Sequence, residues 1–341
     1  MMEQLLKELC LAMGVGGTDG AAKLLAEKLA DYVPTVHTDA LGSVWGIRPA
    51  ADFKAPTLLL EAHLDEIGLI VTGITDKGFL RVSACGGVDT RVLATQRVRV
   101  LCDPPISGVF CSTPPHLSSG DEKLLTAEER GIDVGLPVEE VKKRIPVGTR
   151  VAFAPRFDHL LGDRVCSKAL DDRAGCAAIL RALELLKGKS LPCHVAVLFC
   201  TQEELGIRAA RPATFRLQPD AAIAVDVSFA RTPDAAGCKC GELGGGVMLG
   251  ISPILDSEMT EQLRALARKY EIPMQLEVMS GKTGTDPDGI SLARERVPTT
   301  LLSIPLRYMH TPNEVAALSD IEAVAALMAA FAEEGEVRKN A

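Results

Sequence analysis

The sequence is poor in aromatic residues, which make up 4% of its 341 residues and include a single Trp. It also has no excess of basic charge, because 37 Lys and Arg face 45 Asp and Glu, which gives a net charge of −8. Nucleic-acid binding usually depends on a basic surface, and often on aromatic side chains that stack on bases. The composition therefore argues against a nucleic-acid partner.

Long apolar runs and paired cysteines are missing as well. No apolar stretch reaches the roughly 18 residues of a membrane span, and the N-terminal segment Glu3–Leu11 has the pattern of an amphipathic helix rather than a signal peptide. The ten cysteines contain no Cys-x-x-Cys pair, and only Cys238 and Cys240 lie close together. This pattern favours reduced thiols in a cytoplasmic protein without a membrane partner.

Segments typical of strands and helices alternate over residues 1–67 and 163–341. Continuous apolar runs such as Thr57–Leu60 and His194–Cys200 predict strands that are buried on both faces, whereas Arg173–Leu186 and Ser257–Tyr270 have helical spacing. This alternation predicts an α/β domain with a mostly parallel sheet covered by helices.

Between residues 68 and 162 the pattern of residue types is different. Short β-branched runs such as Leu69–Thr72 and Arg150–Phe153 are separated by Pro-rich turns, with one helical segment at Val138–Arg144. We expect an inserted β domain of small size here, which divides the α/β domain into the two stretches 1–67 and 163–341.

Five groups of acidic and histidine side chains follow predicted strands or precede a predicted helix. Open α/β sheets bind ligands at the carboxyl ends of their strands, so these groups are expected to meet. Imidazole nitrogens and carboxylate oxygens are ligands for zinc, and a two-metal site needs a carboxylate that bridges. The groups are His63 with Asp65, Asp171 with Asp172, Glu203 with Glu204, Asp226, and His310.

Each group by itself also has an ordinary structural explanation. Asp171 and Asp172 precede a helix, where one acidic residue often caps the first turn, although a cap explains only one of the two. Glu203 and Glu204 fit a solvated loop, whereas Asp226 lies inside an apolar strand, where a carboxylate needs a partner. The five groups together indicate a metal site more specifically than any one of them.

In order and spacing, these motifs resemble those of metallopeptidase family 42, which comprises the tetrahedral (TET) and glutamyl-type aminopeptidases. The resemblance extends over nearly the whole chain, including parts of the β insert. It is carried by Ala62-His63-Leu64-Asp65-Glu66-Ile67-Gly68, Ala169-Leu170-Asp171-Asp172-Arg173, Gln202-Glu203-Glu204-Leu205-Gly206, Asp226-Val227 and Tyr308-Met309-His310-Thr311-Pro312.

The resemblance implies a set of metal ligands for two divalent ions per chain. His63 and Asp226 would hold one ion, Glu204 and His310 the other, and Asp171 would bridge them. Zinc is the expected metal, with cobalt or manganese as alternatives, because all three accept imidazole and carboxylate ligands.

The remaining roles and the assembly also follow from the resemblance. Glu203 would be the general base, and Asp65 would orient His63. The implied fold is that of a dinuclear zinc exopeptidase with an inserted β-barrel or PDZ-like domain, which builds dimers and, in many members, dodecamers. One departure is Gly284–Asp288, where Pro287 replaces the Ala that commonly follows Gly-Thr-Asp near the substrate pocket.

The expected function is the release of N-terminal residues from peptides. Glu203 and Asp65 add negative charge beside the ligands, and this charge favours the α-ammonium group of a free N-terminus. A dinuclear deacylase or carboxypeptidase stays an alternative, and it would need an Arg for a substrate carboxylate. Glycoside hydrolysis would leave His63 and His310 unexplained. A non-enzymatic scaffold would not explain a buried Asp226 together with two histidines.

Overall fold

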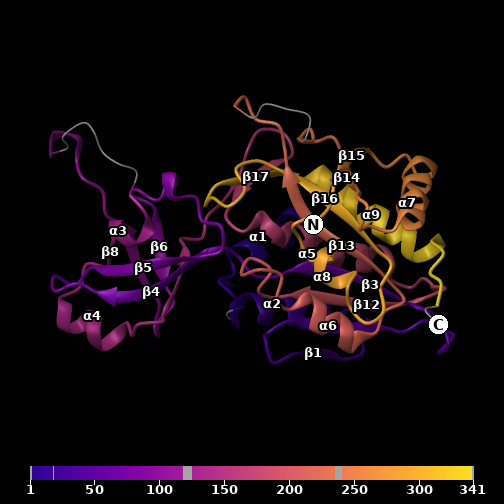
Figure 1. Ribbon diagram of the computed structural model, residues 1–341, viewed down its shortest axis with the longest axis horizontal. Coiled ribbons are helices and arrows are strands. Elements are labelled where there is room, and N and C mark those ends of the chain that lie inside the picture. The colour runs from indigo at the N-terminus through magenta and orange to yellow at the C-terminus, as the bar shows by residue number, and fades with distance from the viewer. Residues whose placement is uncertain (1, 18, 118–124, 235–239, 340–341) are drawn as a thin grey trace.

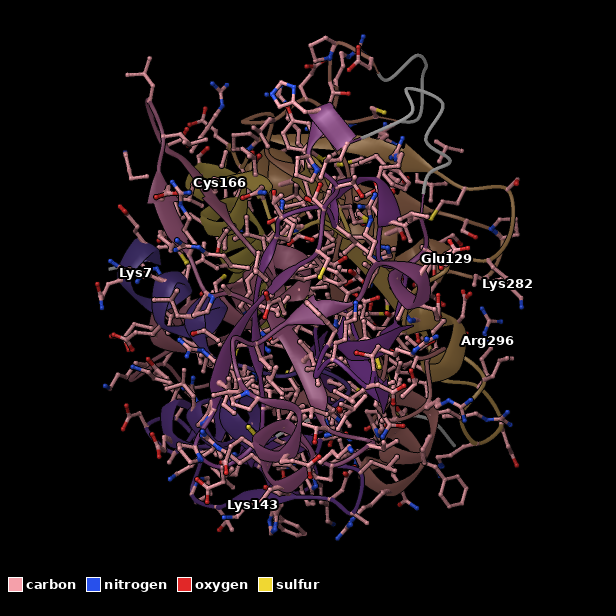
Figure 2. The ribbon with its side chains drawn as sticks, turned by 90° about the vertical axis from the view of Figure 1, so that its left-hand side faces the viewer. Lys7, Glu129, Lys143, Cys166, Lys282 and Arg296 are labelled. Atoms are coloured by element: carbon pink, nitrogen blue, oxygen red, sulfur yellow. The ribbon has the colours of Figure 1, made fainter. Side chains whose placement is uncertain are left out.

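A computed structural model describes residues 2–17, 19–117, 125–234 and 240–339 of the chain. Two parts are visible in Figure 1: a large sheet packed between helices, and a β-barrel that projects from one side of it. Figure 2 looks onto the barrel end of the molecule. Cys238 of the closely spaced cysteine pair lies outside the described residues.

Eight of the described strands form the large sheet. Its centre is the parallel set β12-β3-β13-β16, and antiparallel pairs occur on either side of this set. The predicted mostly parallel sheet is thus confirmed. In spatial order the strands are β1 (Val36–Thr38), β2 (Val44–Arg48), β12 (His194–Cys200), β3 (Thr57–His63), β13 (Ala221–Phe229), β16 (Thr299–Leu306), β14 (Val247–Ile251) and β15 (Met274–Val278).

Alternate residues of the central strands face two different helical layers. Leu58 and Val225 point into a core with α1, α2, α5, α7 and α9, whereas Leu59 and Ala224 point into a smaller core with α6 and α8. Burial on both faces explains why these strands are apolar without interruption. The helices are α1 (Met2–Leu11), α2 (Asp19–Leu29), α5 (Leu170–Leu185), α6 (Ala210–Leu217), α7 (Ser257–Lys269), α8 (Pro287–Ile290) and α9 (Leu318–Glu334).

The inserted segment forms a closed barrel with a hydrophobic core of its own. The expected helix Val138–Arg144 is present as α4. A second short helix, α3 (Ala127–Arg130), was not predicted, and it begins with a capping box between Thr126 and Glu129. The barrel strands are β4 (Gly68–Ile74), β5 (Leu80–Cys85), β8 (Ile132–Asp133), β7 (Ile106–Phe110), β6 (Arg97–Val100) and β9 (Arg150–Phe153), with short 3-10 turns at Thr90–Val92 and Pro115–Leu117.

A three-stranded sheet lies where the chain returns from the barrel. It consists of β10 (Phe157–His159), β11 (Arg164–Ser167) and β17 (Glu314–Ala317). β10 pairs with β11 and not with the barrel, although it precedes residue 162. The division of the chain at residues 68 and 162 stays a prediction. In the described part of the chain, no helix is long and apolar enough to span a membrane.

Candidate metal centre

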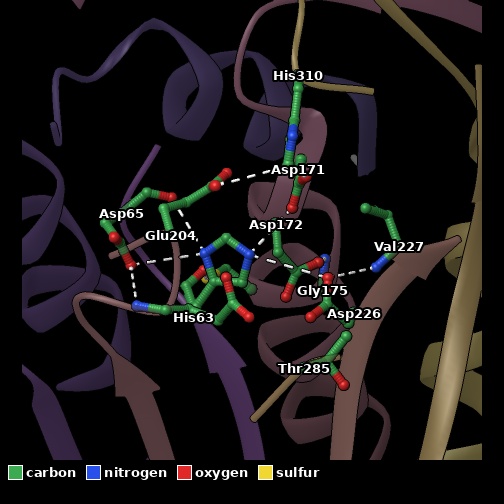
Figure 3. A network of polar contacts seen from close by, with 12 residues as sticks. His63, Asp65, Asp171, Asp172, Gly175, Glu204, Asp226, Val227, Thr285 and His310 are labelled. Carbon is green, nitrogen blue, oxygen red and sulfur yellow. Dashed lines mark hydrogen bonds and ion pairs between the residues drawn. The ribbon is translucent and has the colours of Figure 1, made fainter. Parts of the chain in front are cut away.

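The predicted site residues gather at the carboxyl edge of the four parallel strands (Figure 3). His63 ends β3, and Asp226 lies near the end of the adjacent strand β13. Ala224 is the register partner of Glu61, so strand alternation places His63 and Asp226 on the same face of the sheet. Glu204 follows β12, and His310 follows β16.

Asp171 lies between the two histidines. Its Oδ1 is 3.0 Å from His63 Nε2, and its Oδ2 is 3.5 Å from His310 Nε2. The carboxylate therefore presents one oxygen to each imidazole, as Figure 3 shows. Asp226 Oδ1 is 3.8 Å from His63 Nε2, and Glu204 Oε2 is 3.5 Å from His310 Nε2.

Two groups of side chains here have the composition and spacing of metal-binding clusters. We call His63, Asp172 and Asp226 the inner cluster, and Asp171, Glu204 and His310 the outer cluster. In each, the ligand atoms lie within 4.8 Å of one another. All three inner residues are buried, whereas the outer cluster reaches the surface, because the His310 side chain is 36% exposed.

The two adjacent aspartates have different surroundings. Asp172 Oδ1 accepts a hydrogen bond from the backbone N–H of Gly175 at 2.9 Å, which is the position of a helix cap. Asp171 and Asp172 both have non-helical backbone angles, so the regular helix begins after them. The cap explanation therefore fits Asp172, and it leaves the Asp171 side chain directed at the histidines. Asp172 Oδ2 has no hydrogen-bond partner.

Asp65 contacts both His63 and Glu203. The backbone carbonyl of Asp65 is 3.1 Å from His63 Nδ1, whereas its carboxylate Oδ1 is 3.6 Å from the same nitrogen. Oδ1 accepts a hydrogen bond from the backbone N–H of Glu203 at 3.1 Å. Asp65 therefore contacts the imidazole mainly through its main chain, while its side chain fixes the backbone of the predicted general base.

Negative charge accumulates at this site. Burial raises the pKa of Glu203 to about 7 and that of Glu204 to about 9, and the carboxylate of Asp171 adds to both effects. Burial also raises the pKa of Asp226 well above its usual range. For His63, burial alone would lower the pKa, but Asp171, Asp65 and Asp226 raise it well above the ordinary value. Buried carboxylates at this density need a cation nearby.

The residues fit divalent cations on chemical grounds. Each cluster combines one imidazole with two carboxylates, which is a donor set that zinc, cobalt and manganese accept. The second nitrogen of His63 lies against a carbonyl oxygen, as is usual for a metal-bound imidazole.

The barrel also contributes to the site, which was not predicted from the sequence. A Cβ on Gly87, in the loop after β5, would lie 2.5 Å from His310 Nδ1, and a Cβ on Gly86 would lie 3.1 Å from Glu204 Oε2. The backbone N–H of Asp89 also lies 3.4 Å from the carbonyl oxygen of His310. The absence of a side chain at Gly87 leaves room for the His310 imidazole, whereas a Cβ at residue 86 would need only a small shift of Glu204. Two adjacent glycines after a strand were the only signal in the sequence.

A third group of side chains was also overlooked. Glu61, Cys200 and Asp286 are buried with their ligand atoms within 4.8 Å of one another, on the side of the sheet that α8 covers. Burial raises the pKa of Glu61 well above its usual range, and neighbouring Asp286 raises it further. Asp286 belongs to the Gly284–Asp288 segment, so this segment packs against Glu61 of β3, the strand that ends at His63.

Two carboxylate–imidazole clusters at the carboxyl edge of an α/β sheet are an arrangement found in hydrolases that use metal ions. The chain belongs to the M42 glutamyl aminopeptidase family, whose sequence profile matches residues 42–327. This confirms the resemblance found in the sequence. Family membership implies divalent metal ions, for which both clusters offer ligands.

Individual relatives agree with this assignment. A lysyl aminopeptidase from Pyrococcus furiosus is 34% identical, over 97% of this chain and 96% of its own. The structure of an aminopeptidase from the archaeon Desulfurococcus kamchatkensis superposes with a TM-score of 0.91 at 36% identity, over 97% of this chain and 94% of that one. The Pyrococcus horikoshii TET1 peptidase, which assembles into a tetrahedron or a large octahedral shell, gives a TM-score of 0.87 at 30% identity, over 98% of this chain and 100% of that one.

Proposed function

We propose that this chain is a metal-dependent aminopeptidase that removes N-terminal residues from short peptides. The observation that carries the proposal is the position of Asp171, which presents Oδ1 to His63 and Oδ2 to His310 at 3.0 and 3.5 Å. A carboxylate shared by two imidazoles fits a bridge between two cations.

His63 and Asp226 would hold one divalent ion, Glu204 and His310 the other, and Asp171 both. Zinc is the expected ion, with cobalt or manganese as alternatives. When bound, the ions would lower the pKa of a water molecule and polarise the carbonyl of the scissile peptide bond. The inner imidazole is held for this role by the Asp65 carbonyl at Nδ1, so Nε2 faces the carboxylates.

Glu203 would act as the general base. It is not a member of either cluster, and its backbone N–H is fixed by Asp65 Oδ1. Its carboxylate would take a proton from the attacking water and pass it to the leaving amine. Such proton transfer is typically worth about 10²–10⁴-fold in rate.

The substrate would be a short peptide with a free N-terminus. Glu203 and Asp65 lie close enough to the proposed ligand Glu204 to raise its pKa, and their charge favours an α-ammonium group near the reacting carbonyl. A blocked N-terminus would lack this charge and would add bulk next to the site.

The leading alternative is a deacylase or carboxypeptidase, which would bind a substrate carboxylate through an Arg. Arg173, the arginine next to the aspartate pair, is fully buried and donates to the carbonyl oxygen of Leu9 at 2.7 Å. It therefore faces helix α1 and not the substrate. This observation favours the aminopeptidase.

The assembly is expected to be a homo-oligomer with a dimer as its building block, and a dodecamer is the expected larger form. The Pyrococcus horikoshii TET1 peptidase, which assembles into a tetrahedron or a large octahedral shell, supports this expectation. The barrel (residues 68–162 in the predicted division) is the proposed contact region. We also expect a cytoplasmic location, because the described cysteines are free thiols.

The test compares one tripeptide with its N-acetylated form by mass spectrometry over time, with Zn²⁺, Co²⁺ or Mn²⁺ added to the purified protein. We expect stepwise loss of single residues from the free peptide and at least about a tenfold lower kcat/KM for the acetylated one, or about 1.4 kcal/mol. A chelator should stop both reactions. Equal cleavage of the two peptides, or cuts inside a longer peptide, would contradict the proposal.

A further inference from the structure

Glu314 connects the backbones of two proposed metal ligands. It is the first residue of β17 and is 1% exposed. Its Oε2 accepts a hydrogen bond from the backbone N–H of Asp171 at 3.1 Å, and its Oε1 accepts one from the backbone N–H of His310 at 3.0 Å. Both oxygens of one buried carboxylate are therefore used on main-chain donors, and neither is directed at the clusters.

The two residues that Glu314 holds belong to different segments of the chain. Asp171 lies at the start of α5, and His310 lies in the loop between β16 and β17. Their side chains meet, because His310 Nε2 is 3.5 Å from Asp171 Oδ2. The separation of the two backbones thus sets the distance between two outer-cluster ligands, and Glu314 spans that separation directly.

The loop at His310 needs such support. Its φ angle is +63°, in the left-handed region that residues with a Cβ rarely adopt, and Tyr308 has φ +61°. Non-glycine residues persist in this region where the surroundings hold them. The hydrogen bond to Glu314 Oε1 lies at the N–H of His310 itself.

The pairing of β17 with β11 places Glu314 at this position. β17 pairs antiparallel with β11, and Glu314 is the register partner of Ser167, shortly before Asp171 in the chain.

A buried carboxylate next to Asp171 and Glu204 is electrostatically costly. A neutral amide accepts hydrogen bonds only at its oxygen, so its NH2 group would face the second N–H donor. Only a carboxylate serves both donors.

We propose that Glu314 is a positioning residue, which sets the relative placement of Asp171 and His310 so that the outer cluster binds its cation. This inference rests on the proposed metal centre. It assigns no contact between Glu314 and the metal or the substrate. Its consequence is graded: loss of Glu314 weakens the outer cluster, where both Asp171 and His310 depend on it, more than the inner ion, which shares only Asp171.

The test is a titration of the chelator-treated full chain with Co²⁺, followed by calorimetry and by visible absorption, which reports on the coordination of the ion. In Glu314→Gln, we expect the outer-cluster affinity to fall about 10–100-fold, as for other residues that orient ligands, and its absorption band to change. The inner-cluster affinity should stay within about threefold. His310→Ala identifies which titration step belongs to the outer cluster.

Asp320→Asn is the matched control. Asp320 is buried and accepts hydrogen bonds from the backbone N–H groups of Gly244 at 2.8 Å and Gly246 at 2.7 Å, so it has the same kind of paired contact away from the site. Its loss should lower the melting temperature and leave both Co²⁺ affinities within about twofold of the parent chain. Equal weakening by both variants would mean that Glu314 supports the fold in general, and the inference would be wrong.

The outcomes separate the inference from the proposed function. If the parent chain fails to bind two Co²⁺ ions, the metal centre itself is wrong. If it binds two and Glu314→Gln binds both equally well, only the role of Glu314 is wrong. Should Glu314→Gln fail to fold, Glu314→Asp replaces it, because the shorter side chain reaches only one of the two donors and should show the same graded loss. If neither variant folds, the inference is overturned.

Discussion

The inner and outer clusters lie side by side, but they are built in different ways. The inner cluster takes His63 and Asp226 from adjacent parallel strands in the middle of the sheet, and both are buried. In the outer cluster, Glu204 and His310 come from loops, and the His310 side chain is 36% exposed, against 2% for His63. Strand register alone places two of the inner ligands, whereas the outer ligands depend on contacts between separate segments.

The two clusters also differ in the contacts that hold their ligands in place. Around the outer cluster, the barrel loop at Gly87 contacts His310, and Glu314 holds the backbones of Asp171 and His310. Around the inner cluster, the support is sheet pairing, because β3 pairs with β12 up to His63 and β13 pairs with β16 past Asp226. The outer cluster should therefore be the more sensitive to changes at a distance, and substitutions that touch one cluster, both or neither test this comparison.

The largest effect is expected for Asp171→Asn, since Asp171 faces both histidines. Removing its charge leaves both cations with one carboxylate fewer, so both clusters should lose metal. We expect kcat/KM to fall by at least about 10⁴-fold, which corresponds to the several kcal/mol that bound metal ions contribute. Elemental analysis and peptide assays measure the two effects. Two ions retained at full occupancy would show that Asp171 is not shared.

Glu203→Gln should separate catalysis from metal binding. Because Glu203 belongs to neither cluster, both metal ions should stay bound, while kcat falls by about 10²–10⁴-fold through loss of the proton acceptor. The measurements are metal content and steady-state rates on the same preparation. A variant with most of its kcat would require another general base.

Gly87→Ala tests the contribution of the barrel to the outer cluster. The new Cβ would lie 2.5 Å from His310 Nδ1, so the loop or the imidazole must move. Overpacking of this kind costs about 1–3 kcal/mol, so we expect outer-cluster Co²⁺ affinity to fall by about tenfold or more. Gly73→Ala is the control in the same barrel, where the nearest atoms are 3.9 Å away. If both variants bind Co²⁺ alike, the barrel has no role in the site.

The smallest effect is expected for Asp172→Asn, although Asp172 belongs to the inner cluster by distance. Asn retains an oxygen that accepts from Gly175 N–H, and Asn and Asp are comparable helix caps. We expect two bound ions, and kcat/KM within about tenfold of the parent chain. Loss of one ion by elemental analysis would instead make Asp172 an inner ligand. The assignment of Asp172 as a helix cap and of Asp171 as the shared ligand would then be wrong.

Much of the architecture followed from local patterns. Continuous apolar runs predicted buried strands such as β12, and helical spacing predicted α7 to within one residue at its C-terminal end. A carboxylate within the apolar strand β13 and a histidine at the end of β3 marked the edge of the sheet where ligands bind. Burial and strand alternation act over a few residues, so the order of residue types is enough to reveal them.

The sequence by itself thus determined the family, the strand that carries Asp226, the strand that leads to His63, and the site residues as candidates. Only the tertiary structure decided that Asp172 accepts a hydrogen bond from Gly175 at the start of the helix, that Asp65 contacts His63 mainly through its carbonyl, and that Gly87 and Glu314 support the outer ligands. For Gly87 and Glu314, the physical reason is that their contacts with His310 and Asp171 join segments distant in the chain. Their geometry depends on the register of β11 with β17 and on the docking of the barrel, for which adjacent residues carry no signal.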